Sequence, residues 1–113
     1  MHEMSLAENI IQLIEDASLE QQFTQVITVW LEIGQLACVE KESLRFYFDV
    51  VTQDSIAWQA KLEIIEIAGQ ALCNQCNQEI SITAYHEACP HCGSYELQVT
   101  RGDEMRIKEL EVR

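Results

Sequence analysis

The sequence is poor in basic residues, in proline and in long apolar runs. It has 7 Lys and Arg against 19 Asp and Glu in 113 residues, so its formal charge is −12. A surface this acidic repels phosphate backbones and anionic lipids, which argues against nucleic-acid and membrane partners. No apolar run reaches the ~20 residues of a membrane span, and the first residues lack the basic region of a signal peptide. We therefore expect a cytoplasmic protein.

Apolar residues recur with helical spacing in two segments and with strand spacing in three others. The helical spacing predicts helices over residues 5–20 and 39–52, with Tyr47 and Phe48 in the buried stripe of the second. Alternation and β-branched residues predict strands over 26–34, 61–67 and 105–112. Ser5 and Glu8 have the spacing of a capping box, which predicts a helix start at Ser5 after a free arm of residues 1–4.

Four of the five cysteines form two Cys-x-x-Cys pairs with 12 residues between them. The four are Cys73, Cys76, Cys89 and Cys92. Two residues between cysteines let both sulfurs of a tight turn converge on one ion, and two such turns complete a tetrahedron. Asn77 and Gly93, which follow the pairs, tolerate the positive φ that such turns need. Because four thiolates leave no open position, the expected ion is a structural Zn²⁺.

The order of these segments predicts an α+β fold. A small domain with two helices and a three-stranded sheet, residues 1–68 with 103–113, carries an inserted zinc-ribbon-like lobe, residues 69–102. Zinc binding can supply ~10 kcal/mol to the folding of so small a lobe. The residues expected to back it in short strands are Ile80, Ile82, Tyr95, Leu97 and Val99.

Other readings of the cysteines remain open. An iron–sulfur cluster also accepts four cysteines, and a thioredoxin-like redox pair needs a single pair at a helix start. His86 and His91 are close enough in sequence to replace a cysteine ligand, but we expect solvent-exposed loop residues. We expect Cys38, which precedes the second helix, to be a buried apolar filler rather than a nucleophile.

The amino terminus reads Met1-His2-Glu3. A bulky second residue blocks removal of the initiator methionine, so Met1 keeps a free α-amine. This amine, the His2 amide and the His2 imidazole can close fused chelate rings, with Glu3 supplying an amide nitrogen or a carboxylate oxygen. Nitrogen ligands in a plane suit Ni²⁺ or Cu²⁺. The competing interpretation is a solvated histidine at a frayed terminus.

Several segments together resemble the HypA/HybF family of hydrogenase nickel-incorporation proteins. The matching pieces are Met1-His2-Glu3, Leu31-Glu32-Ile33-Gly34, Val39, Ser43-Leu44-Arg45-Phe46, Phe48-Asp49, the two cysteine pairs with Cys89-Pro90-His91-Cys92-Gly93-Ser94, and Ile107 to Val112. They occur in the expected order along the whole chain. Asp54-Ser55 and Trp58 depart from the Gly-Thr and Glu expected there, but none of these is a predicted ligand.

The resemblance implies a metallochaperone and not an enzyme. It implies Ni²⁺ binding through His2 with Met1 and Glu3 nearby, and zinc on the four paired cysteines. The implied partners are the GTPase HypB and the large subunit of [NiFe]-hydrogenase, and a homodimer is compatible with the sequence.

The alternative is a zinc-ribbon module that binds protein or nucleic acid. Ribbons that bind nucleic acid carry Lys, Arg and aromatic residues on their hairpins. Between Cys73 and Cys92 this chain has no Lys or Arg, which disfavours the nucleic-acid form.

Overall fold

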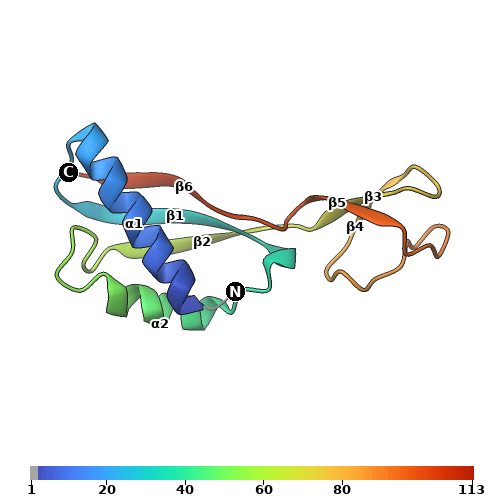
Figure 1. The fold of residues 1–113 in the computed structure, drawn as a ribbon, viewed down its shortest axis with the longest axis horizontal. Helices are drawn as coiled ribbons and strands as arrows, with labels where there is room; N and C mark the ends of the chain where they lie inside the picture. The colour runs from blue at the N-terminus through green and yellow to red at the C-terminus, as the bar shows by residue number, and fades with distance from the viewer. Residues whose placement is uncertain (1–2) are drawn as a thin grey trace. The chain divides into compact units, whose positions relative to one another are not determined.

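The computed structural model describes residues 3–113. Its helices are α1 (Glu3–Gln21), the 3-10 helix η1 (Gln35–Ala37) and α2 (Lys41–Val51). Its strands are β1 (Val26–Gly34), β2 (Lys61–Ile67), β3 (Gln70–Cys73), β4 (Glu79–Ser81), β5 (Leu97–Arg101) and β6 (Met105–Val112). The strands form two three-stranded sheets, in the orders β2-β1-β6 and β4-β3-β5 (Figure 1). The predicted α+β class and the three strands of the first sheet are confirmed.

The chain divides into two compact units. The helical unit reaches to Leu31 and also contains Val39–Ile64 and Ile107–Arg113. The cysteine unit consists of Glu32–Cys38 and Ile65–Arg106. Within residues 3–113, no helix is both long and apolar enough to cross a membrane.

The core of the helical unit is built by α1, α2 and β1. The two helices pack against each other. The buried apolar residues of these elements in the unit are Leu6, Ala7, Ile10, Ile11, Ile14, Val26, Val29, Leu31, Leu44 and Phe48. Phe48 is buried as predicted, whereas Tyr47 is exposed, because it lies one residue away from the stripe that faces α1. On the sheet, the Thr28 hydroxyl donates to the Glu111 carboxylate at 2.8 Å, which joins β1 to β6.

The start of α1 differs from the prediction. Glu3 and Met4 are already helical, so Ser5 lies inside the first turn and the expected capping box and free arm of four residues are wrong. A carboxylate in the first turn interacts favourably with the positive end of the helix dipole, which explains why a helix can extend through Glu3. A serine followed three residues later by a glutamate can also occur inside the first turns of a helix, so this spacing alone does not mark the helix start.

The cysteine unit has a small core around β3, a strand that the sequence did not predict. β3 pairs antiparallel with β4 and β5, with Ala71 opposite Ile80 on one side and Val99 on the other. The buried core residues are Leu36, Ala71, Cys73, Ile80, Ile82 and Cys89. Ile80, Leu97 and Val99 lie in short strands and line this core as expected. Ile82 also lines it but follows the end of β4, and Tyr95 is exposed and precedes β5. Leu36 comes from η1, far from the cysteines in sequence.

Close backbone contacts hold η1 in the cysteine unit. The backbone N–H of Leu36 donates to the Gly102 carbonyl at 2.7 Å, and that of Gly34 donates to the Glu104 carbonyl at 2.8 Å. A Cβ on Gly34 would lie 2.0 Å from the Gly102 carbonyl oxygen, so only glycine allows this approach. The Gly69 N–H also donates to the Gln35 side chain at 3.2 Å. Residues 34–36 are thereby tied to the segments that flank the cysteines.

Candidate metal centre

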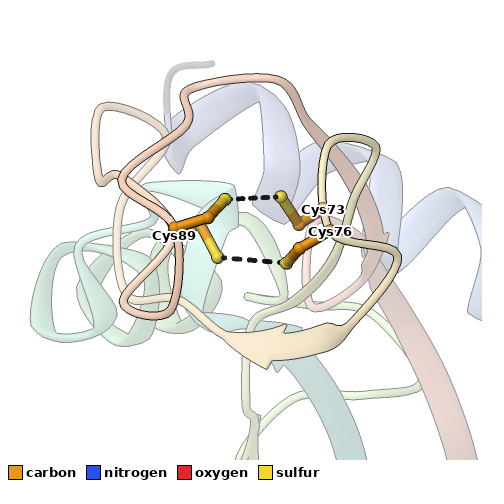
Figure 2. Close-up of side chains that lie close together, drawn as sticks. Cys73, Cys76 and Cys89 are labelled. Carbon is orange, nitrogen blue, oxygen red and sulfur yellow. Dashed lines mark hydrogen bonds between the residues drawn. The ribbon is translucent and has the colours of Figure 1, made fainter.

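The four paired cysteines converge on one point. Their sulfur atoms all lie within 4.8 Å of one another. The Sγ atoms of Cys73 and Cys92 are 3.6 Å apart, and those of Cys76 and Cys89 are 3.8 Å apart (Figure 2). Zn–S bonds of about 2.3 Å in a tetrahedron place sulfurs about 3.8 Å apart. The cluster therefore has the dimensions of a four-thiolate zinc site.

Each cysteine pair is held by the same two backbone hydrogen bonds. The N–H of Asn77 donates to the Cys73 carbonyl, and the N–H of Gly93 donates to the Cys89 carbonyl, each at 2.8 Å. Cys73 and Cys89 in turn donate their own N–H groups to the carbonyls of Gln78 and Ser94 at 2.9 and 2.8 Å. The repeated pattern makes two equivalent turns that present two sulfurs each.

Positive backbone φ angles follow both pairs, as predicted. Asn77 has φ 58° and Gly93 has φ 75°. Asparagine and glycine adopt this left-handed conformation more readily than other residues. The residue choice at these two positions therefore allows both turns to close over the ion.

Hydrogen bonding and desolvation shift the pKa values of Cys73 and Cys92 in opposite directions. The Cys76 backbone N–H lowers the pKa of Cys73 to about 7. At Cys92 the Ser94 N–H also acts to lower the pKa, but desolvation and the neighbouring sulfurs of Cys73 and Cys89 outweigh it and raise the pKa to about 12. The metal-free cluster thus forms one thiolate readily and resists forming four. A cation supplies the positive charge that four thiolates require.

The remaining predicted residues stand apart from this cluster. His86 and His91 are exposed, as expected. Cys38 is exposed as well, so its prediction as a buried filler is wrong. It lies at the end of η1 in a left-handed conformation, with φ 57°, which turns the chain toward α2 and keeps the side chain at the surface. Its thiol donates to the Leu36 carbonyl, with the sulfur and the oxygen 3.6 Å apart.

The predicted nickel ligands lie at the start of the chain. Glu3 is half-buried in the first turn of α1. Met1 and His2 fall outside the described residues, so their predicted role as ligands is not tested by this geometry. Within residues 3–113, the four paired cysteines are the group of three or more ligand side chains close enough to share one ion.

Residues 1–112 match the family described as "Hydrogenase/urease nickel incorporation, metallochaperone, hypA". The chain belongs to the HypA family. It is 58% identical over 112 residues to hydrogenase maturation factor HypA of Azotobacter chroococcum and 56% identical to that of Azotobacter vinelandii, with 99% of each chain covered. Its fold is similar to the solution structure of the Ni metallochaperone HypA from Helicobacter pylori, with a TM-score of 0.74 and 26% identity over 99% of this chain and 97% of that one.

Membership in the HypA family decides between the two functions considered from the sequence. The protein is a nickel metallochaperone for hydrogenase maturation, and the family is non-catalytic. The cysteine cluster is consistent with zinc, and nickel binding follows from the family. Its partners belong to the hydrogenase maturation machinery.

Proposed function

We propose that this HypA-family protein carries Ni²⁺ on its first three residues and holds a structural Zn²⁺ on Cys73, Cys76, Cys89 and Cys92. It delivers the nickel to the large subunit of [NiFe]-hydrogenase and acts together with the GTPase HypB. Four cysteine thiols kept reduced for a metal suit the cytoplasm.

The closed sulfur site suits a resident ion rather than a cargo. Cys73 and Cys89 are buried, and four sulfurs fill a tetrahedral shell, so a departing ion has to break a complete set of thiolate bonds. Thiolate ligands also favour zinc over the nitrogen-rich environment that suits Ni²⁺. A transported ion needs a second site with easier release.

The chemistry of the first residues carries this proposal. Met1 and His2 offer an amine, an amide and an imidazole nitrogen, the kind of ligand that suits Ni²⁺. Glu3 opens α1, and the first N–H groups of a helix have no acceptor within the helix. The Glu3 amide nitrogen is thus free of that constraint and can bind a metal. The positive end of the helix dipole opposes a bound cation, which favours release.

The partners follow from the family and from charge. A formal charge of −12 favours encounter with basic surfaces on other proteins. A homodimer is a further assembly that this proposal accommodates. Light scattering of the zinc-loaded protein at several concentrations, alone and with HypB, measures both assemblies.

The central experiment is metal analysis of the untagged protein. His2→Ala is expected to abolish specific nickel binding in calorimetry, while zinc stays at one ion per chain in mass spectrometry. His91→Ala is the matched control, because it removes an exposed histidine beside the cysteine cluster. It should leave both metals unchanged.

An amino-terminal extension tests the α-amine ligand separately. One extra residue before Met1 should weaken nickel binding about as much as His2→Ala. Unchanged nickel affinity in His2→Ala would refute the proposed cargo site, and equal affinity with and without the extension would refute amine ligation. Loss of zinc in His2→Ala would show that the two sites are not separate.

A further inference from the structure

α2 carries an exposed apolar surface that the core of the helical unit does not use. Phe46 is 56% exposed, and Tyr47 and Val50 are 36% and 40% exposed. Phe46 and Val50 are one turn apart, so their side chains are neighbours on the helix. We call these three residues the aromatic face. The inner side of the same helix holds the buried Leu44 and Phe48.

The two rings of the aromatic face support each other. The centroids of Phe46 and Tyr47 are 5.3 Å apart with an interplanar angle of 70°, an edge-to-face arrangement. Such a pair limits ring motion, and rigid aromatic side chains supply much of the binding energy in protein interfaces. The face therefore has the composition of an anchor and not of a solvated helix surface.

The charged residues around the aromatic face are acidic. Glu42 precedes Phe46 by four residues and Asp49 follows it by three, so both lie beside it on the helix. Both side chains are exposed, and within residues 3–113 no ion pair to either carboxylate is found. Arg45 is directed elsewhere, since its guanidinium donates to the Leu62 carbonyl in β2. A complementary surface therefore combines an apolar cleft with Lys or Arg side chains at its edge.

The position of α2 indicates which partner uses the face. α1 and α2 pack against each other, and Figure 1 draws the first turn of α1 beside the first turn of α2. Phe46 is five residues from the start of α2, which corresponds to about 8 Å along a helix. A protein docked on the aromatic face thus lies on the same unit as α1, which begins at Glu3. Direct transfer of an ion between ligand sets needs the two sets to be close together.

We propose that the aromatic face docks the protein that accepts the nickel, through an apolar cleft on that protein bordered by basic side chains. The inference rests on the proposed function for its direction, because it assumes that the cargo leaves from the amino terminus. The docking contact itself involves no metal ligand, so it can be measured without nickel.

The experiment uses zinc-loaded, nickel-free protein and the nickel-free precursor of the [NiFe]-hydrogenase large subunit as the probe. Phe46→Ala is expected to raise Kd at least tenfold, and Val50→Ala about threefold. Asp49→Lys should raise Kd severalfold and reduce its dependence on salt. Because Phe46 is largely exposed, Phe46→Ala should keep its melting temperature within a few degrees of the parent.

Two exposed apolar residues outside the face provide matched controls. Leu19→Ala on α1 and Tyr95→Ala in the cysteine unit remove side chains that are 83% and 74% exposed. Each should change Kd less than twofold. Equal effects of these controls and of Phe46→Ala would show nonspecific adhesion and overturn the proposal.

The GTPase HypB is the competing occupant. Weaker binding of Phe46→Ala to HypB, with unchanged binding to the large subunit, would overturn the proposed occupant, and unchanged binding to both would overturn the docking site. Failure of the cargo site is a separate result: it appears as unchanged nickel affinity in His2→Ala. His2→Ala is expected to bind the nickel-free large subunit as tightly as the parent.

Discussion

The helical unit and the cysteine unit obtain their order from different sources. The core of the helical unit consists of aliphatic and aromatic side chains from two helices and a strand. Among the described residues, the buried core of the cysteine unit has six members, and two of these are Cys73 and Cys89 of the cysteine cluster. The first core depends on the amount of apolar surface that it buries. The second buries far less apolar surface, which is consistent with a metal ion on the four cysteines contributing to its stability.

Removing the zinc site should produce the largest difference in stability between the two units. Cys89→Ser takes away a buried ligand, and loss of the ion removes about 10 kcal/mol of coupled folding free energy. Amides of β3 should then exchange rapidly, while those of α1 stay protected. Hydrogen exchange of the whole chain, with zinc analysis, measures both. Persistent protection of β3 without zinc would show that the six-residue core is sufficient.

The same leucine-to-alanine change in each unit should show how differently the two cores respond. Leu36→Ala and Leu44→Ala each remove a buried leucine and should cost about 3 kcal/mol. Leu36→Ala is expected to lower zinc affinity and the protection of β3, whereas Leu44→Ala should expose amides of α1 and α2. Denaturation with hydrogen exchange tests the pair, and Leu19→Ala serves as the exposed control. If Leu36→Ala left zinc affinity unchanged, η1 would not belong functionally to the cysteine unit.

Replacing either of two glycines of the cysteine unit by alanine should lower stability by less than the leucine substitutions do, and by different amounts. An added Cβ at Gly34 meets the Gly102 carbonyl oxygen at 2.0 Å, so Gly34→Ala should cost about 2 kcal/mol through overpacking. Gly93 has open space around it but a φ of +75°, so Gly93→Ala should cost about 1 kcal/mol through backbone strain alone. Thermal unfolding of the zinc-loaded variants ranks them. The reverse order would contradict the role given to the close approach of Gly34 and Gly102.

Acid should have the smallest effect on the cysteine unit, and in a defined direction. The pKa of Cys73 is lowered from 9.0 to about 7, so the stability from its thiolate is complete above pH 9 and is lost as pH falls through about 7. The pKa of Cys92 is raised to about 12, so its deprotonation comes last. Acidification of the zinc-loaded protein should therefore release the ion as the thiolates take up protons, which zinc analysis and ultraviolet thiolate absorbance follow together. A zinc content that stays constant while the thiolate absorbance falls would contradict this prediction.

The pattern of the sequence predicted the regular elements well. The alternation of Val29, Leu31 and Ile33 places β1, because a half-buried strand leaves a period of two in the sequence. The prediction from periodicity failed where a strand is too short to show a repeating pattern. β3 has four residues and ends at the first ligand cysteine, so no periodicity marks it. The capping motif at Ser5 failed because it describes a local spacing that the favourable position of Glu3 overrides.

The convergence of the four paired cysteines was predicted from the sequence, but the segments that support them were not. Cys-x-x-Cys spacing is a local property of tight turns, and so are the positive φ angles of Asn77 and Gly93. The contribution of Leu36 was not predictable, because the segment that carries it precedes the cysteines by more than thirty residues. Cys38 was misplaced for a related reason: its exposure depends on a left-handed turn that cysteine composition does not indicate.

The sequence by itself determined the acidic charge, the order of the two long helices and of the strands of the first sheet, the pairing of four cysteines and the likeness to a nickel-carrying family. These properties depend on residue type and short-range spacing, which the chain carries before it folds. Only the tertiary structure decided that η1 belongs to the core around the cysteines, and that Phe46 and Tyr47 lie outside the core that Phe48 helps to build. Burial is set by which segments pack together, and contacts between distant segments leave no periodic mark in the sequence.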